Sequence, residues 1–117
     1  MKLSIAIPTY NRAFHLDKNL KLLLNQYSNN FQVIVQDNYS KDNTSMIIEK
    51  YIKLGLPIIY EKNPKNLGWA KNFEICFKKV KTKYMILLGD DDIIINGGIN
   101  IILENIDRYN PDLIFMN

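Results

Sequence analysis

The chain has 117 residues, of which 47% are hydrophobic and 23% are charged, and its formal net charge is +3. This is the size of one small domain with enough apolar residues for a core. The mild charge, without a long basic block, argues against a nucleic-acid-binding protein. With Cys76 as the one cysteine and His15 as the one histidine, an internal disulfide and a Cys/His metal motif are excluded.

The N-terminal residues lead directly into an apolar run and do not form a signal peptide. No apolar run approaches the roughly 18 residues of a transmembrane helix. We therefore expect a cytoplasmic protein. Four clustered lysines are interpreted as a helix end and its solvated loop, and they also allow a weak peripheral association with the inner face of an anionic membrane. They are Lys78, Lys79, Lys81 and Lys83.

Apolar runs and amphipathic stretches alternate along the chain. The predicted strands span residues 3–7, 31–36, 57–61, 84–88 and 112–116. The predicted helices span residues 13–27, 42–53, 67–80 and 98–107. Pro8 is expected to end the first strand, because proline cannot donate to a sheet ladder. The alternation predicts an α/β fold with a mostly parallel sheet and helices on both faces.

One strand leads straight into three carboxylates. Residues 84–88 (YMILL) fit a central strand covered on both faces, and Gly89 follows them. Asp90, Asp91 and Asp92 then stand at the carboxyl end of this strand, where open α/β sheets bind ligands. Adjacent carboxylates repel, and a hard divalent cation such as Mg²⁺ or Mn²⁺ relieves that conflict with oxygen ligands. The alternative is a solvated acidic turn.

The loops after the other predicted strands should meet at the same edge of the sheet. The loop at residues 8–12 lacks both the G-x-G-x-x-G fingerprint and the P-loop motif, which disfavours a dinucleotide-binding Rossmann site. Tyr10 in this loop is a candidate to stack on a base, or else a packing residue. Asp37 ends the second strand, where a carboxylate accepts hydrogen bonds from a ribose or a base, or else forms a turn.

The predicted third helix opens with a further set of polar residues. Asn66 is a candidate N-cap, and Lys71 or Asn72 is placed to reach the ligand edge. A helix N-terminus favours anions. A capped helix with a solvated lysine is the alternative interpretation.

Four of these segments together resemble the N-terminal half of the family 2 glycosyltransferases with the GT-A fold. They are residues 4–12 (SIAIPTYNR), residues 33–42 (VIVQDNYSKD), Asn66-Leu67-Gly68 with Asn72, and residues 87–92 (LLGDDD). The four follow one another in the order and spacing of that family and cover essentially the whole chain. The resemblance implies a Rossmann-like GT-A fold and transfer of a sugar from a nucleotide-diphosphate sugar, often a UDP-sugar, to an acceptor hydroxyl with Mn²⁺ or Mg²⁺.

The resemblance also implies roles for individual residues. Asp37 would bind the base, Asp91 the ribose or sugar, and Asp92 the metal that bridges the two phosphates, while Asp90 offers a second D-x-D register. Gly89 replaces the usual first aspartate of the motif, and Asp37-Asn38-Tyr39-Ser40 stands where an acidic pair or Asp-Gly-Ser is common. The residues expected to bind the nucleotide are Pro8, Thr9, Tyr10, Arg12, Asp37, Asn66, Lys71, Asp90 and Asp91.

In the family, the general base comes from a C-terminal half that binds the acceptor. We expect residues 1–117 to be the nucleotide-sugar-binding part, with the acceptor-binding part beyond Asn117. The polypeptide alone would then bind donor and transfer poorly or not at all. The expected partners are a nucleotide-sugar donor and a saccharide or lipid-linked acceptor, with no nucleic acid.

Other classes of protein fit the residues less well. A sugar-phosphate nucleotidyltransferase requires a glycine-rich basic loop after the first strand, which residues 8–12 do not supply. A phosphoacceptor receiver domain requires an acidic pair where Thr9-Tyr10 stands and an acceptor aspartate where Lys62-Asn63 stands. A nucleotide-binding α/β module without turnover stays an alternative.

Overall fold

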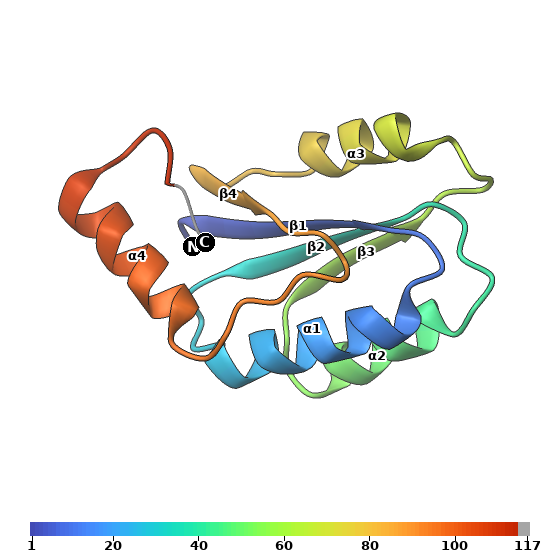
Figure 1. The fold of residues 1–117 in the computed structure, drawn as a ribbon, viewed down its shortest axis with the longest axis horizontal. Coiled ribbons are helices and arrows are strands. Elements are labelled where there is room, and N and C mark those ends of the chain that lie inside the picture. Colours follow the sequence, from blue (N-terminus) through green and yellow to red (C-terminus); the bar gives the residue numbers. More distant parts are fainter. Residues whose placement is uncertain (115–117) are drawn as a thin grey trace.

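The computed structural model describes residues 1–114, which form a four-stranded parallel sheet flanked by helices (Figure 1). The strand order is β3-β2-β1-β4, and every neighbouring pair is parallel. The strands are β1 (Leu3–Thr9), β2 (Gln32–Asp37), β3 (Ile58–Lys62) and β4 (Tyr84–Leu87). In this arrangement β2 and β1 are the two inner strands, and all four carboxyl ends point to one edge.

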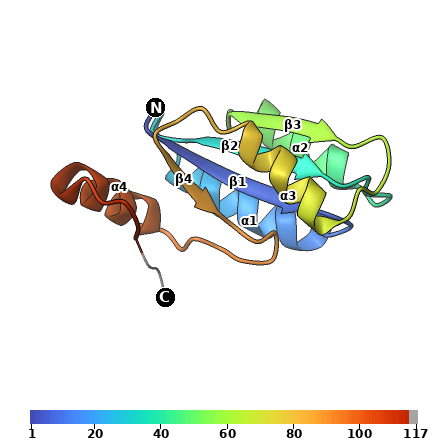
Figure 2. The same ribbon diagram turned by 90° about the horizontal axis from the view of Figure 1, so that it is seen from above.

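Helices cover both faces of the sheet, as predicted. Helices α1 (Ala13–Gln26) and α2 (Thr44–Lys53) lie on one face, and α3 (Trp69–Lys78) lies on the other (Figure 1). Helix α4 (Gly98–Tyr109) projects beyond the amino ends of the strands (Figure 2). Within residues 1–114, no helix combines the length and apolar character needed to cross a membrane.

The side chains of β1 alternate between two apolar cores. Leu3, Ile5 and Ile7 face the larger core under α1 and α2. Ala6 faces the smaller one with Ile34 and Cys76 of α3. Burial raises the pKa of the Cys76 thiol to about 11, so this cysteine stays protonated and unreactive at neutral pH.

Strand β1 continues through Pro8, contrary to the expectation that this proline would end it. Pro8 is in register with Gln36 of β2. The backbone of Ala6 faces β4, because its carbonyl accepts a hydrogen bond from the N–H of Leu88. Alternate residues of a strand face the same way, so the backbone nitrogen of Pro8 also faces β4. Since β4 ends at Leu87, no carbonyl of that strand is left without a donor, and the proline is tolerated.

Strand β4 lies at the edge of the sheet, which corrects the prediction of a central strand covered on both faces. Helix α3 packs over β1 and β2, so Met85 and Leu87 of β4 stay 38% and 43% exposed. The predicted strand over residues 112–116 is not formed at 112–114, and its remainder lies outside the described residues. Residues 112–114 instead line an apolar pocket beside β4.

A tyrosine–aspartate contact joins α1 to α2 and makes stability depend on pH. The hydroxyl of Tyr51 donates to the carboxylate of Asp17, and Lys50 also contacts this carboxylate at 2.9 Å. These two contacts, the tyrosine first, hold the pKa of Asp17 below its usual value. The resulting stabilisation is therefore complete above the unfolded pKa of about 4 and is lost as the pH falls through the folded pKa.

We expect Tyr51→Phe to lower the free energy of unfolding by about 1 kcal/mol at pH 7, because the charge-assisted hydrogen bond is lost while Asp17 stays partly solvated. The deficit should shrink at pH 3, because the stabilisation declines as the pH falls from the unfolded pKa of about 4 towards the lowered folded pKa of Asp17. Urea unfolding at the two pH values measures the difference. An equal deficit at both would mean that the hydroxyl acts only through the Asp17 carbonyl, to which it also donates at 2.9 Å.

Candidate functional site

The loops that follow β1 and β2 are joined by backbone hydrogen bonds at the carboxyl edge of the sheet. The N–H of Asn38 donates to the carbonyl of Thr9 at 2.9 Å. The N–H of Asn11 donates to Ser40 Oγ at 2.8 Å, and the Asn11 side chain accepts from the N–H of Lys41 at 2.8 Å. The two loops therefore form one surface.

Buried amide side chains attach the loop after β3 to this surface. Asn38 Oδ1 accepts from Asn63 Nδ2 at 3.1 Å and from the N–H of Leu67 at 2.9 Å. Asn72 of α3 accepts from Asn63 Nδ2 at 2.8 Å and donates to the Gln36 carbonyl at 3.0 Å. Asn38 and Asn63 were not predicted as site residues, although two asparagines within predicted loops are a usable signal for turn-forming side chains.

Asn66 does not cap α3 as expected. The helix begins at Trp69, after Gly68, whose φ of +84° favours glycine and separates Asn66 from the helix. Asn66 Oδ1 accepts instead from the Gly68 N–H at 2.8 Å and from Asn38 Nδ2 at 2.9 Å. Lys71 lies on the exposed side of α3, 3.5 Å from Glu74.

Asp37 is fully buried at the end of β2. Its Oδ1 accepts from the N–H of Ser40 at 2.8 Å, and its Oδ2 accepts from the hydroxyl of Tyr60 on β3 at 2.7 Å. Burial, and then the hydrogen bond to Asp37, raise the pKa of Tyr60, so the phenol remains a donor at neutral pH. Asp37 therefore shapes the loop in this structure.

The three aspartates after β4 face the loop after β1. Asp90 Oδ2 accepts from Thr9 Oγ1 at 2.9 Å. Asp91 Oδ2 lies 3.8 Å from the guanidinium of Arg12. Asp92 makes no side-chain hydrogen bond or ion pair with the described residues and is exposed. The structure thus brings together Thr9, Arg12 and the three aspartates that the sequence singled out.

Two of these carboxylates lie against the position where Gly89 lacks a side chain. A Cβ on Gly89 would lie 2.7 Å from Asp92 Oδ2 and 3.2 Å from Asp91 Oδ1. Two carboxylate oxygens thus converge over this glycine, and oxygen donors suit Mg²⁺ or Mn²⁺. Within residues 1–114, no group of three or more acidic, histidine or cysteine side chains could hold an ion alone. An ion here would need further oxygens, such as those of a diphosphate.

We expect Gly89→Ala to displace the Asp92 carboxylate without unfolding the protein. The φ of Gly89 is not in the left-handed region, and the clash is with the end of an exposed side chain that can rotate away. Metal-dependent nucleotide binding should therefore weaken about 10-fold, as for the loss of a group that orients a metal ligand. Isothermal titration with UDP and Mn²⁺ measures the change, and thermal unfolding is the control. A lower Tm with unchanged binding would contradict this reading.

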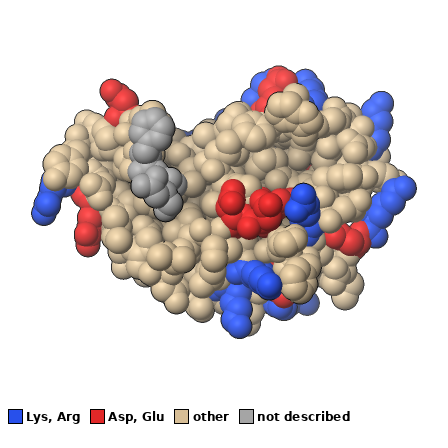
Figure 3. Space-filling model, in the orientation of Figure 1, with Lys and Arg blue, Asp and Glu red and all other residues tan. Residues whose placement is uncertain are grey.

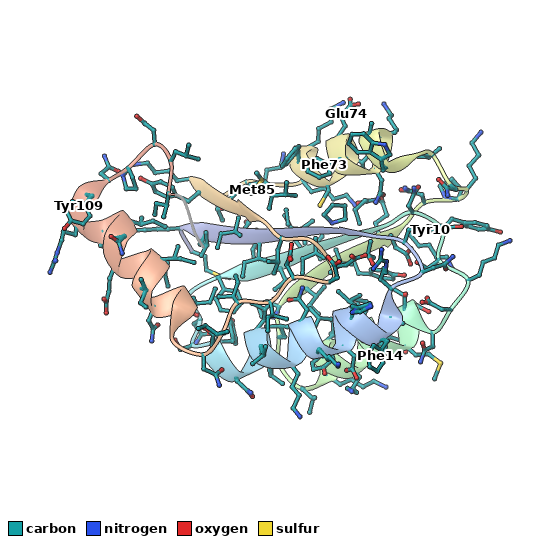
Figure 4. All side chains as sticks on the ribbon, in the orientation of Figure 1. Tyr10, Phe14, Phe73, Glu74, Met85 and Tyr109 are labelled. Carbon is teal, nitrogen blue, oxygen red and sulfur yellow. The ribbon has the colours of Figure 1, made fainter. Side chains whose placement is uncertain are left out.

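Aromatic side chains border the same edge. Tyr10 follows β1 directly and is 41% exposed at this end of the sheet (Figure 4). Tyr39 has a φ of +72°, which is strained for an aromatic residue, and the ammonium groups of Lys41 and Lys62 lie 5.9 and 5.5 Å from its ring centre. Pro8 lies within β1 and is half-buried.

Acidic and basic side chains lie next to one another on the face that Figure 3 shows. Acidic side chains gather near its middle with a basic side chain against them, and basic side chains are more frequent towards the right-hand end (Figure 3). Such an arrangement offers a cation and an anion neighbouring places to bind. A nucleoside diphosphate with a divalent metal has this charge pattern.

Comparison with known protein families decides the classification. The family model described as glycosyl transferase family 2 matches residues 4–117. The chain belongs to this family. It spans about a third of the length of the curated family 2 relatives described next.

The abequosyltransferase RfbV of Salmonella typhimurium is 31% identical over 110 residues, which are 92% of this chain and 33% of that protein. A GalNAc(5)-diNAcBac-PP-undecaprenol beta-1,3-glucosyltransferase of Campylobacter jejuni is 28% identical, over 88% of this chain and 34% of that protein. The crystal structure of Staphylococcus aureus TarS 1–349 in complex with UDP superposes with a TM-score of 0.88 at 28% identity, covering 96% of this chain and 34% of that one. TarS 1–349 has also been solved with UDP-GlcNAc, and that structure superposes with a TM-score of 0.87.

The structural match identifies the fold of this family 2 chain as GT-A, as the sequence resemblance implied. The parallel sheet and the helices on both faces are the corresponding features here. Sugar transfer is the activity that the names of these relatives state. The individual contacts to a donor remain predictions.

Proposed function

We propose that residues 1–117 are the donor-binding part of a glycosyltransferase that uses a UDP-sugar and a divalent metal ion. The observation that supports this most directly is the convergence of the Asp91 and Asp92 carboxylates over Gly89, with Arg12 3.8 Å from Asp91. UDP is the first choice of nucleotide because TarS, a 28% identical neighbour, was solved with UDP and UDP-GlcNAc.

In this proposal the base and ribose lie against the loops after β1 and β2. Tyr10 offers an exposed ring at the edge of the site. Thr9 at the end of β1 hydrogen-bonds Asp90 in the loop after β4. Asp37 supports the loop after β2 by accepting from the N–H of Ser40. Asp37 then acts on the base indirectly, through the loop that it supports. A direct contact with the base would require the hydrogen bond from Tyr60 to be replaced by one from the nucleotide.

The aspartate turn, defined as residues 89–92, would face the diphosphate. Asp92 and Asp91 would hold Mn²⁺ or Mg²⁺, since both offer exposed carboxylate oxygens. The metal would offset the negative charge that develops on the departing diphosphate. Arg12 lies beside Asp91, and Asp90 already accepts a hydrogen bond from Thr9. This assigns the metal to the Asp91–Asp92 pair and a supporting role to Asp90.

The acceptor and the general base are proposed to lie outside residues 1–117. Deprotonation of an acceptor hydroxyl needs a base within hydrogen-bond reach of it. The C. jejuni relative acts on an undecaprenol-linked saccharide, and TarS is a poly(ribitol-phosphate) transferase. We propose a saccharide or a lipid-linked saccharide as the acceptor class for this protein too, which is compatible with an association with the membrane surface.

Calorimetric titration of UDP into the polypeptide, with Mn²⁺ and with EDTA, tests the proposal. We expect binding that Mn²⁺ strengthens and EDTA weakens. GDP and dTDP serve as matched competitors, and tight binding of either in place of UDP would replace the nucleotide but retain the site. No binding of any of the three with Mn²⁺ present would overturn the proposed function.

A further inference from the structure

One fully buried side-chain atom under the aspartate turn has no hydrogen-bond partner. Asn19 of α1 is 0% exposed, and its Oδ1 is the single buried side-chain oxygen or nitrogen within residues 1–114 that lacks a partner. A buried polar group without a partner costs free energy, and native structures seldom retain one without a reason. A functional explanation is suggested by the contact that the nitrogen of the same amide makes with Gly89.

The other end of this amide reaches the turn that carries the aspartates. Asn19 Nδ2 donates to the carbonyl of Gly89 at 3.4 Å, which is a long hydrogen bond. The same carbonyl also accepts from the N–H of Asp92 at 3.0 Å. Exchanging the oxygen and nitrogen of the amide would place two oxygens 3.4 Å apart and leave the NH₂ group unpaired. Either orientation therefore leaves one end of Asn19 unsatisfied.

A second amide on α1 holds the later part of the same segment firmly. Gln26 lies two helical turns beyond Asn19, donates to the carbonyl of Ile94 at 2.8 Å and accepts from the N–H of Ile99 at 3.1 Å. Both of its ends are thus used. The chain after β4 runs along α1 in this region (Figure 1). Gln26 therefore fixes residues 94–99, whereas the contact of Asn19 with the aspartate turn is long.

We infer that Asn19 is a positioning residue for the aspartate turn, an inference that rests on the proposed function. When UDP and the metal ion bind, Asn19 Oδ1 accepts a backbone N–H of the turn. The adjacent carboxylates repel one another without a cation. Once the cation removes this repulsion, the turn closes onto the free oxygen of the amide, and both ends of Asn19 are then satisfied. The N–H of Asp91 is the expected donor, because the planar trans peptide points the N–H of Asp90 away from the Gly89 carbonyl that Asn19 already binds.

The substitution Asn19→Leu separates this role from packing, because leucine has nearly the same shape and no polar atom. We expect the Tm of the ligand-free protein to stay the same or to rise by about 4 to 8 °C, since an unpaired buried group is removed. We expect UDP affinity in Mn²⁺ to fall about 10-fold, the effect of one hydrogen bond. UDP affinity in EDTA should not change.

Two further variants complete the experiment. Asn25→Leu makes the same chemical change at an exposed position of α1 and should alter neither the Tm nor the Mn²⁺-dependent affinity. Asn19→Ala removes the amide without adding apolar bulk, and it replaces Asn19→Leu if leucine prevents folding. In Asn19→Ala the Tm falls because a cavity forms, but the loss of Mn²⁺-dependent affinity is still expected.

The possible results distinguish this inference from the proposed function. If the wild-type chain shows no Mn²⁺-dependent UDP binding, the proposed function fails, and this inference fails with it. If the wild type shows such binding and both Asn19 variants retain it, Asn19 only packs, and this inference alone is overturned. Weaker binding in Mn²⁺ with unchanged binding in EDTA supports the positioning role.

Discussion

Asp92→Ala should remove the Mn²⁺-dependent part of UDP binding and leave the fold intact. Loss of a group that merely orients a metal ligand costs about 10- to 100-fold in affinity, so loss of the ligand itself should cost at least about 100-fold. The carboxylate is exposed and makes no hydrogen bond or ion pair with the described residues, so stability should change by less than about 0.5 kcal/mol. Calorimetric titration with UDP and Mn²⁺, together with thermal unfolding, measures both effects.

Asp112→Ala is a matched control, since it removes an exposed carboxylate beside the apolar pocket at β4, outside the donor site. Asp90→Ala distinguishes the two D-x-D registers. Asp90 accepts from Thr9, so its loss should weaken binding less than the loss of Asp91 in Asp91→Ala. The opposite order would assign the metal to Asp90 with Asp92 and would refute the Asp91–Asp92 pair.

Asp37→Ala should have the largest effect on stability among the site residues. It leaves the Tyr60 hydroxyl and the Ser40 N–H without their acceptor in a buried position. Each hydrogen bond to a buried charged group contributes about 1.5 to 3 kcal/mol, so we expect a loss of about 3 kcal/mol or more. This is a large share of the 5 to 15 kcal/mol of a typical domain. Urea unfolding measures the loss, and UDP binding should weaken because the loop over residues 38–41 is released.

Tyr60→Phe separates the loop-supporting role of Asp37 from a direct contact with the nucleotide. It retains the carboxylate and the Ser40 contact but frees Asp37 Oδ2. A loss of stability without a loss of UDP affinity in Tyr60→Phe supports a structural role for this hydrogen bond. Tighter UDP binding in Tyr60→Phe would show instead that the freed oxygen binds the base.

Most of the fold could be predicted because the sheet is parallel. Strands of a parallel sheet are short apolar runs, and segments with helical periodicity separate them. Residues 3–7 and 31–36 could be recognised for that reason. Edge and central positions could not be separated, since the run YMILL is apolar at every position although two of its side chains stay exposed in β4. Whether Pro8 could lie within β1 depended on where β4 ended. This is a property of strand pairing between distant parts of the chain.

The location of the site could be predicted from the sequence better than its individual contacts. The carboxyl ends of the strands identified the loops that meet, and Thr9, Arg12 and the aspartates do lie together. The burial of Asp37 depends on Tyr60, which is 23 residues away on β3, so no local pattern could indicate it. Asn19 did leave a signal, because it is a polar residue within the apolar stripe formed by Leu16, Leu20 and Leu23.

Within residues 1–114, no strand pairs with the outer edge of β4, and this should affect how the polypeptide behaves in solution. An unpaired strand edge exposes backbone N–H and carbonyl groups that another chain can extend. Beside that edge, Met85 of β4 and Phe73 of α3 lie on the same side of the sheet (Figure 4). Met85 and Leu87 add exposed apolar surface there, and β4 carries no charged side chain to oppose a second copy. Isolated chains should therefore self-associate along β4 as their concentration rises, unless another polypeptide segment covers this strand.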